Sequence, residues 1–253
     1  MKIATWNVNS LKVRLPQVLD WLAVQRPDVL CLQELKLEDK AFPLTEVQAA
    51  GYHAAFLGQK TYNGVAILSR TAAQDILYNI PGFDDVHKRL LVATMDGVRV
   101  VCGYFPNGQA LGSDKFAYKL EWLTALTTWL QDELRTNPRL VLAGDFNIAP
   151  ATADVHPAWK DELLVSAPER AAFQALLDLG LTDAFRLFSQ AEDSFSWWDY
   201  RMGAFRRNFG LRIDHLLVSQ TLVPACRACM IDTAPRKLER PSDHAPVVLE
   251  LDT

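Results

Sequence analysis

The stretch from Leu140 to Asn147 limits what this chain can fold into more than any other part of the sequence. Four apolar residues and a glycine lead directly into Asp145, and Asn147 follows two residues later. A short unbroken apolar run is typical of a strand that is buried on both faces of a sheet. Such a strand would hold a carboxylate and an amide rigidly at the rim of a cleft.

Other apolar runs in the sequence also have polar side chains at their ends. Asn7 and Glu34 each follow such a run, and the pair Asp243 and His244 precedes one. Burying an unpaired charge is costly, so carboxylates at several strand ends are hard to explain by structure alone. Together these positions predict one site that combines a metal ion with a base.

The remaining pattern predicts interspersed helices and strands. Pro16 fits the first turn of an opening helix, and Pro27 ends that helix. Asp96-Gly97 between two apolar runs is the strongest short hairpin signal in the chain. We expect helices near residues 15–22, 114–134 and 166–180, a loop over 149–165, and strands at 3–6, 28–34, 52–57, 64–69, 90–95, 98–104, 139–143, 213–219, 225–232 and 246–251.

Strands outnumber helices, and at least one antiparallel hairpin is present. We therefore predict an α/β fold in which two mixed β-sheets pack face to face with helices outside. The 253 residues suit one large domain or two small ones. No apolar run approaches the roughly 20 residues needed to cross a bilayer, and the N-terminal residues lack the apolar stretch of a signal peptide. We expect a cytoplasmic protein that does not engage membranes.

The four cysteines predict structural roles. Cys31 and Cys102 stand in apolar runs and read as small core residues. Cys226 and Cys229 form a C-x-x-C with no second pair, and on a strand their side chains would face opposite ways. This pattern favours core packing over a zinc site.

Oxygen-bearing side chains indicate which metal the site would take. Asn7, Glu34 and Asp243 offer hard oxygen ligands, which suit Mg²⁺ or Mn²⁺. Each has a structural alternative. Asn7 could cap a turn, Glu34 could close a salt bridge, and Asp243 could be a turn residue.

One histidine stands out as a proton-transfer group. His244 adjoins Asp243, and its imidazole would need an orienting partner. Asp214 interrupts an apolar strand, so we predict the pair Asp214–His244; the alternative is a satisfied buried pair without a catalytic role. His215 is the competing histidine, but it alternates to the other face of its strand from Asp214. The remaining histidines have no chemical neighbours in the sequence and are read as structural: His53, His87 and His156.

Aromatic and basic residues point to a phosphate-bearing polymer. Tyr104 ends a strand and could donate to a phosphate, although tyrosines there often only pack. The stretch Trp197–Arg201 suits stacking on a base or sugar beside a phosphate; its alternative is a core strand with an exposed arginine. From Arg201 to Arg212 there are four arginines and no acid, although the net charge of the chain is −4. Local patches matter more than net charge, because salt screens charges beyond about 8 Å.

Several short motifs carry a family resemblance that covers essentially the whole chain. They are Thr5–Asn9, Leu32–Lys36, Tyr62–Ala66, Tyr104–Gly108, Gly144–Asn147, Gly210–Asp214 and Ser242–His244. With these motifs the chain resembles the exonuclease III family of abasic-site endonucleases, within the endonuclease/exonuclease/phosphatase superfamily. The resemblance implies a four-layer, DNase I-like α/β sandwich that spans residues 1–253 as a single domain. It also implies a Mg²⁺-dependent phosphodiesterase, with Mn²⁺ able to substitute, that cleaves duplex DNA 5′ to abasic sites.

The resemblance also implies a role for each candidate residue. Metal binding falls to Glu34, Asn7 and Asp243. In catalysis, Asp145 would handle the proton of the attacking water. Asn147, Tyr104 and His244 would contact the phosphate, and Asp214 would orient His244. The pocket for a flipped-out abasic sugar falls to Trp197, Leu211 and Ile213. Further DNA contacts fall to Lys36, Arg89, Asn107, Arg201, Arg206 and Arg207.

Two positions depart from relatives of this family. Asn9 stands where some relatives have aspartate, which leaves the question of a second metal site open, and Leu35 stands where relatives often have threonine.

The alternative functions are another phosphoesterase of the superfamily, acting on inositol phosphates or sphingomyelin, or a catalytically silent DNA-binding module. The basic run and the full set of polar residues favour a DNA enzyme that acts as a monomer on abasic sites or blocked 3′ ends. The sequence leaves open how much 3′→5′ exonuclease and 3′-phosphatase activity accompanies incision.

Overall fold

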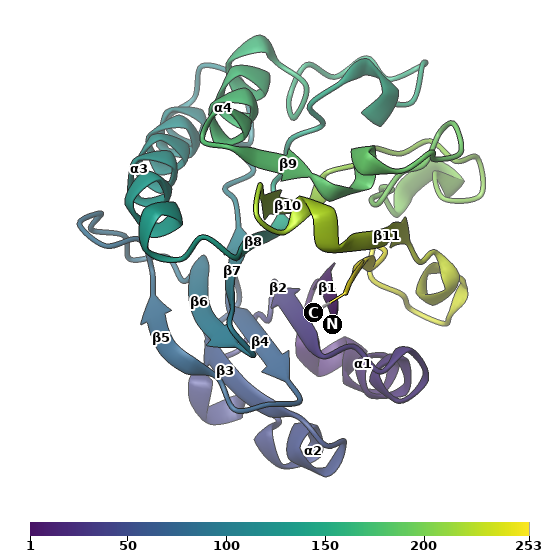
Figure 1. The fold of residues 1–253 in the computed structure, drawn as a ribbon. Helices are drawn as coiled ribbons and strands as arrows, with labels where there is room; N and C mark the ends of the chain where they lie inside the picture. The colour runs from purple at the N-terminus through teal and green to yellow at the C-terminus, as the bar shows by residue number, and fades with distance from the viewer. Residues whose placement is uncertain (253) are drawn as a thin grey trace.

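Two six-stranded mixed sheets packed face to face form the framework of the computed structural model, which describes residues 1–252 (Figure 1). The first sheet has the order β11-β12-β1-β2-β4-β3, and the second has the order β5-β6-β7-β8-β10-β9. The first comprises β1 (Lys2–Asn7), β2 (Val29–Gln33), β3 (His53–Leu57), β4 (Val65–Ser69), β11 (Cys226–Ile231) and β12 (Val247–Leu251). The second comprises β5 (Gln74–Tyr78), β6 (Leu90–Met95), β7 (Val98–Tyr104), β8 (Leu140–Asp145), β9 (Leu181–Asp183) and β10 (Asp214–Ser219).

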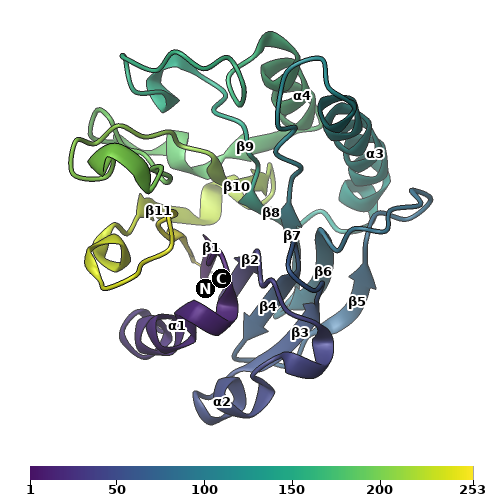
Figure 2. The same cartoon turned by 180° about the vertical axis from the view of Figure 1, so that it is seen from behind.

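Helices cover the outer face of each sheet. Helices α1 (Leu11–Gln25) and α2 (Leu44–Ala49) lie outside the first sheet, and α3 (Asp114–Thr136) and α4 (Ala167–Asp178) lie outside the second, as both views show (Figures 1 and 2). The predicted four-layer α/β sandwich is therefore confirmed. In the described part of the chain, neither α3 nor any other helix combines the length and apolar character of a membrane span.

Each sheet has a parallel pair of strands near its centre. β1 and β2 run parallel and are joined through α1, and β7 and β8 run parallel and are joined through α3. Parallel strands need such a crossover, and their carboxyl ends lie at the same edge of the sheet. β1 also packs against β8 across the two sheets. The polar residues that end these four strands consequently meet at one edge of the sandwich.

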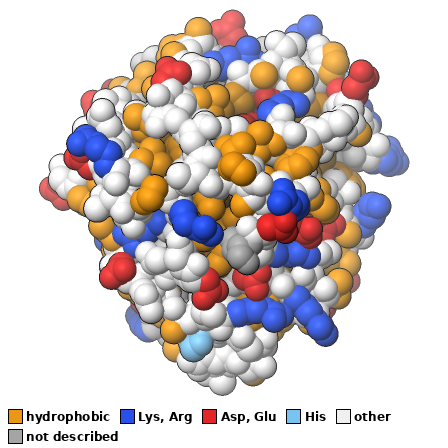
Figure 3. All heavy atoms as spheres, in the orientation of Figure 1, with side chains coloured by type: hydrophobic (Ala, Val, Ile, Leu, Met, Phe, Trp, Pro, Cys, Tyr) orange, Lys and Arg blue, Asp and Glu red, His pale blue; other side chains and the backbone are white. Residues whose placement is uncertain are grey.

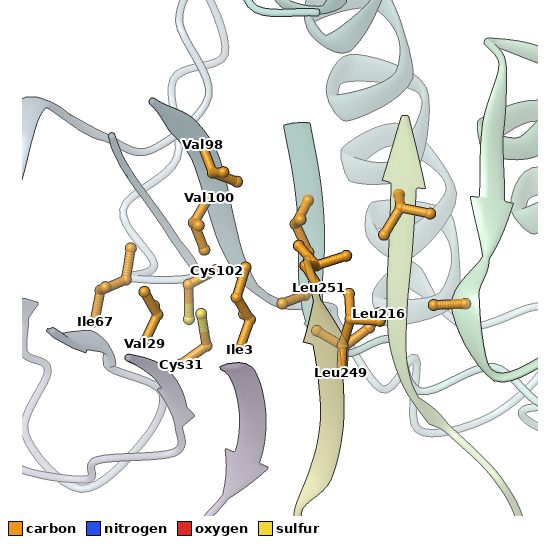
Figure 4. Packing of buried hydrophobic residues seen from close by; sticks show 14 of the residues in the cluster. Ile3, Val29, Cys31, Ile67, Val98, Val100, Cys102, Leu216, Leu249 and Leu251 are labelled. Atoms are coloured by element: carbon orange, nitrogen blue, oxygen red, sulfur yellow. The ribbon is translucent and has the colours of Figure 1, made fainter. Parts of the chain in front are cut away.

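The core between the sheets consists almost entirely of aliphatic residues and cysteines (Figure 4). Ile3 and Val29 from the first sheet face Val100 from the second, and all three are fully buried. Burial of each such side chain contributes about 1.5–3 kcal/mol. Cys31 and Cys102 approach from opposite sheets with their sulfurs turned toward each other, and burial raises the pKa of the Cys31 thiol. The prediction that these two cysteines are core residues is confirmed.

The C-x-x-C motif differs from the expectation in one respect. Cys226 and Cys229 are free and buried, as predicted for structural residues. However, both belong to the inner core, so they do not face opposite ways. The register of β11 against β12 shifts between Cys226 and Ala228, and this irregularity brings the two thiols to the same face.

The helix boundaries also refine the predictions. α1 begins at Leu11, so Pro16 lies inside the helix and not in its first turn. The helix ends before Pro27, as predicted, with Arg26 in the left-handed conformation. α4 begins with a capping box formed by Ser166 and Glu169. The elements missed by the prediction are β5, β9 and α2, which are short or exposed and carry little periodicity.

Candidate active site

Residues from both sheets meet at the edge where the parallel pairs end. β1 delivers Asn7, the residue after β2 is Glu34, and β8 delivers Asp145. The antiparallel strands β10 and β12 contribute from their amino-terminal ends, where Asp214 begins β10 and His244 stands just before β12. The structure therefore confirms the prediction that the ends of these distant strands meet at one place.

Two carboxylates and an imidazole lie close enough to share a cation. Glu34, Asp145 and His244 each offer a ligand atom, and these atoms lie within 4.8 Å of one another. The Lys36 ammonium pairs with Oε2 of Glu34 at 2.8 Å. The two carboxylates are hard oxygen donors, so the residues fit a divalent cation of the Mg²⁺ or Mn²⁺ class.

Asn7 orients both carboxylates. Its Nδ2 donates to Oε1 of Glu34 at 2.8 Å and to Oδ2 of Asp145 at 2.9 Å. Its Oδ1 accepts from the Asn9 backbone N–H at 2.9 Å, which fixes the orientation of the amide. The amide thus presents its nitrogen, not its oxygen, to the carboxylates. A role for Asn7 as a metal ligand stays a prediction.

Asp243 lies beside this group and is held by protein donors. Its Oδ1 accepts from Nδ2 of Asn9 at 2.9 Å, and its Oδ2 accepts from Nε1 of Trp197 at 3.0 Å. Burial acts to raise the pKa of Asp243, but the charge of His244 and the two hydrogen bonds outweigh it and lower the pKa. Asp243 is therefore a carboxylate at the rim of the cavity, and its metal-ligand role stays a prediction.

The predicted contact between Asp214 and His244 is present. Nδ1 of His244 lies 2.9 Å from Oδ2 of Asp214, and both side chains are buried. Ser196 donates its hydroxyl to the same carboxylate oxygen at 2.7 Å. Burial acts to lower the pKa of His244, but the charges of Asp214 and Asp145 outweigh it and raise the pKa to about 10. The imidazole is accordingly a cation whose Nε2 lies 3.8 Å from Asp145.

Asp145 lies at the centre of the site with almost no exposure. Burial raises its pKa to about 7, although the nearby His244 charge opposes that change. The carboxylate also accepts from the backbone N–H of Asn147 at 2.9 Å. A carboxylate with a raised pKa accepts a proton more readily than an ordinary one, which suits a general base.

Asn147 and Tyr104 complete the polar floor of the site. Asn147 has a left-handed backbone with φ of 50°, and its Nδ2 donates to the carbonyl of Phe105 at 3.0 Å. Nδ2 of Asn107 donates to Oδ1 of Asn147 at 3.0 Å. Burial and the charges of Glu34 and Asp145 raise the pKa of the Tyr104 phenol, which therefore stays a hydrogen-bond donor.

A cavity of about 400 Å³ opens over these residues. Trp197 and Ile213 line it, as predicted. Leu211 is a correction, because it is fully buried and its backbone bonds to Trp197 behind the cavity wall. The opposite wall was not predicted, since it comes from the aperiodic loop after β8. Its residues are Trp159, Asp161, Leu163 and Leu164.

The predicted DNA contacts surround this cavity to different extents. Arg201 lines it and pairs with Asp199 at 2.5 Å, while Arg206 and Arg207 are exposed in the following turn. The fourth arginine of the basic run, Arg212, is buried against Asp154 and Asp183 and cannot reach DNA. On the face in Figure 3, acidic and basic side chains are interspersed.

Arg89 and Asn107 belong to a second cavity of about 470 Å³ that adjoins the first through Tyr104. The guanidinium of Arg89 lies over the Tyr104 ring at 4.9 Å. Lys36 lies at the carboxylate cluster, and its Nζ approaches Oδ1 of Asn9 as well as Glu34. A DNA contact for each of these residues stays a prediction.

Comparisons with known proteins agree with this geometry. Residues 4–244 match the Endonuclease/Exonuclease/phosphatase family. The chain is 38% identical to the exodeoxyribonuclease III of Haemophilus influenzae, with 99% of each sequence covered. It is similar to the structure of the 3′ phosphatase NExo from Neisseria bound to a product DNA hairpin, with a TM-score of 0.97 and 51% identity over 100% of both chains. It is also similar to an AP endonuclease from Archaeoglobus fulgidus, with a TM-score of 0.96 and 38% identity over 100% of both chains.

Proposed function

Since the chain belongs to the endonuclease/exonuclease/phosphatase family and is a nuclease of the DNA repair type, we propose a specific reaction for it. The protein hydrolyses the backbone of duplex DNA on the 5′ side of abasic sites. The observation that carries the proposal is the cluster of Glu34, Asp145 and His244 within 4.8 Å at the floor of a cavity walled by Trp197. We further propose that residues 1–253 act as one domain and as a monomer in the cytoplasm.

Glu34 would hold a divalent cation, with Asn7 nearby and Asp243 behind it. A bound Mg²⁺ or Mn²⁺ supplies positive charge that polarises the scissile phosphate and offsets the charge that develops on it. The amide of Asn7 donates to both carboxylates and so helps to fix their positions. Lys36 adds positive charge at the outer oxygen of Glu34.

The proton chemistry falls to Asp145 and His244. Asp145 would orient the attacking water and take its proton, a contribution of roughly 10²–10⁴ in rate. His244, held through Nδ1 by Asp214, would donate from Nε2 to a phosphate oxygen. Asn147 and Tyr104 would add neutral donors to the same oxygens, and preorganised donors of this kind stabilise the transition state. Water would attack in line, leaving a 3′-hydroxyl.

The cavity above these groups would select the lesion. Trp197, Ile213 and Trp159 add apolar surface to a cavity whose remaining lining is mostly polar. Such a cavity suits a sugar without its base, and a nucleotide without a base costs less to extrude from the duplex.

A second candidate function is removal of a phosphate or nucleotide from a blocked 3′ end. The observation that favours it is the similarity to a structure described as a 3′ phosphatase, at 51% identity over the whole of both chains. The same metal site and base would serve, because a terminal phosphate monoester needs the same attack by water.

The first experiment is incision of a labelled duplex that contains one abasic site, with Mg²⁺ and with EDTA. We expect incision only with the metal. Asp145→Asn and His244→Ala should each lose at least about 10²-fold in kcat, the low end for a proton-transfer group. Circular dichroism of both variants controls for folding. Turnover of inositol phosphates without cleavage of abasic DNA would overturn the proposed substrate.

The second experiment separates the two DNA activities. Three matched duplexes carry an abasic site, a nick with a 3′-phosphate, or a recessed 3′-hydroxyl, and kcat/KM is measured for each. A higher value for the abasic duplex supports endonuclease function. A higher value for the 3′-phosphate assigns the chain to 3′-end repair, and a higher value for the recessed end assigns it to exonuclease function.

A further inference from the structure

A fully buried ion pair links the two outer helices of the second sheet. Lys119 of α3 lies 2.5 Å from Oε1 of Glu169 on α4, and neither side chain has any exposure. Oε1 of Glu169 also accepts from the Leu164 backbone N–H at 3.1 Å, and Oε2 accepts from the hydroxyl of Ser166 at 2.6 Å. The carboxylate is therefore well satisfied, and the lysine is the cation that balances its charge.

The Lys119 ammonium also reaches both loops that form the polar floor of the active site. Its Nζ donates to the carbonyl of Asn147 at 2.7 Å and to the carbonyl of Asn107 at 3.3 Å. These two asparagines are bonded to each other through their side chains. One buried cation thus ties the backbone of two segments that are distant in the sequence but meet at the reacting phosphate.

The backbone of Asn147 is fixed by hydrogen bonds on all sides. Its φ of 50° is the left-handed conformation, which asparagine tolerates better than most non-glycine residues. The N–H is held by Asp145, the side-chain amide by the carbonyl of Phe105, and the carbonyl by Lys119. Hydrogen bonds from a charged donor are roughly twice as strong as neutral ones. The bonds from Lys119 to the carbonyl and from the N–H to Asp145 are therefore the two charge-assisted contacts that hold this conformation.

Stability alone does not explain why a charge is buried here. Replacing a buried ion pair by apolar residues is often neutral or stabilising, so a pair that only joined α3 to α4 would be dispensable. The contacts to two catalytic-loop carbonyls give the cation a specific task.

We propose that Lys119 is a positioning residue for the reaction, and that Glu169 supplies the negative charge that keeps the lysine protonated in the interior. Lys119 does not touch the substrate. It fixes the backbone of Asn147, whose side-chain Nδ2 donates to the carbonyl of Phe105 at 3.0 Å and to Oδ2 of Asp145 at 3.3 Å, and so keeps this residue in place beside the catalytic carboxylate. The inference rests on the proposed function, since it concerns the same phosphate site.

The test uses the double variant Lys119→Met/Glu169→Gln. It removes both charges together, so no unpaired buried charge remains, and glutamine keeps an acceptor for the cap of α4. The matched control is Arg99→Met/Glu133→Gln. Arg99 of β7 and Glu133 of α3 form another shielded ion pair, 2.6 Å apart, near the opposite end of that helix from Lys119.

Two measurements are made on both double variants. Amide hydrogen exchange at residues 146–149 reports loop positioning without any substrate. Single-turnover and steady-state cleavage of DNA give kcat and KM. We expect faster exchange at 146–149 and a kcat lower by about 10- to 100-fold, with KM nearly unchanged, in the Lys119 variant only.

The outcomes separate this inference from the proposed function. Unchanged exchange and a kcat equal to that of the Arg99 control would overturn the positioning role. Faster exchange at 146–149 in a protein whose wild type cleaves no DNA would support the positioning role and refute the proposed substrate. The single variant Lys119→Met, which leaves Glu169 unpaired, should have a lower Tm than the double variant.

Discussion

At the scale of single residues, two buried histidines have opposite charge states. Nδ1 of His215 faces the guanidinium of Arg212 at 3.0 Å, and a guanidinium only donates, so Nδ1 accepts. Nε2 then carries the proton and donates to the carbonyl of Ile148 at 2.9 Å. Burial and the charge of Arg212 lower the pKa of His215 to about 4, whereas the pKa of His244 is raised to about 10. His215 was expected to lie on the opposite face of its strand from Asp214, which left His244 as the predicted partner of that carboxylate. The difference in charge state agrees with this expectation.

The His215 environment predicts how stability depends on pH. The unfolded imidazole binds a proton below about pH 6.5, while the folded one stays neutral down to about pH 4. The unfolded state therefore binds more protons in this window, and the free energy of unfolding falls as the pH drops from 6.5 to 4, by about 3 kcal/mol from this residue. Urea denaturation between pH 7 and pH 4 measures it. In His215→Gln this part of the loss should disappear; equal losses in both proteins would contradict the assignment.

Much of the residue-level site could be predicted because strand ends are visible in sequence. Apolar runs that stop at Asn7, Glu34 and Asp145 identify side chains at a sheet edge. What could not be predicted is which neighbours those side chains bond. The donors that hold Asp243, for example, come from Asn9 and from the indole of Trp197, which lie far from it in the chain.

Two contributions were missed for different reasons. Lys119 had a readable signal, because it stands three residues after Phe116 and four before Leu123, on the apolar stripe of α3. A lysine on that stripe predicts a buried partner. Trp159 had no such signal in the sequence, because it lies in a loop whose path depends on tertiary packing. Its ring packs against that of Phe209, with 5.3 Å between the ring centroids.

At the scale of elements, the helices and central strands follow from periodicity and the edges do not. The continuous apolar runs of β1, β2, β7 and β8 made these strands plain in the sequence. β5 is largely exposed, and β9 has three residues, so neither carries a pattern strong enough to predict. The bulge that turns Cys226 and Cys229 to the same face depends on pairing with β12, which sequence alone does not give.

A close approach between β7 and β8 makes one glycine essential. Gly144 pairs with Gly103, and a Cβ built on Gly144 would lie 1.9 Å from the Gly103 carbonyl oxygen. Gly144→Ala should therefore push the strands apart, lower stability by about 1–3 kcal/mol or more, and displace the adjoining Asp145. Thermal unfolding and DNA cleavage measure the two effects.

The control for that prediction is Gly82→Ala. Gly82 has φ of 78°, but a Cβ there would have no neighbour within 4 Å. Only the left-handed backbone opposes the substitution, at about 1–2 kcal/mol. Its kcat should equal that of the wild type. If Gly144→Ala were as active as Gly82→Ala, the spacing of β7 and β8 would not control the site.

At the scale of the whole molecule, the proposed function requires a protein of negative net charge to bind a negatively charged polymer. The net charge is −4, so attraction to DNA depends on local clusters near the cavity. Arg206 and Arg207 are exposed there, whereas Arg212 is neutralised inside by Asp154 and Asp183. Each phosphate neutralised by a side chain releases counterions, which makes binding depend on salt.

Arg206→Ala should weaken DNA binding at low salt and reduce the slope of log K against log salt by about 1. Fluorescence anisotropy with an abasic duplex, at several salt concentrations and without a cleaving metal, measures the slope. Arg135→Ala is the matched control, because Arg135 is exposed at the end of α3, where it pairs with Asp132. Equal slopes for the two variants would remove Arg206 from the interface.

The position of β1 has a consequence for how the protein is made. β1 lies between β2 and β12, and Lys2 pairs with Glu250 across the antiparallel boundary. A nascent chain on the ribosome therefore holds Asn7 and Glu34 long before His244 has been translated. One edge of β1 stays unpaired until β12 has been made. Because His244 stands just before β12, a partly translated chain that lacks this region would also lack nuclease activity.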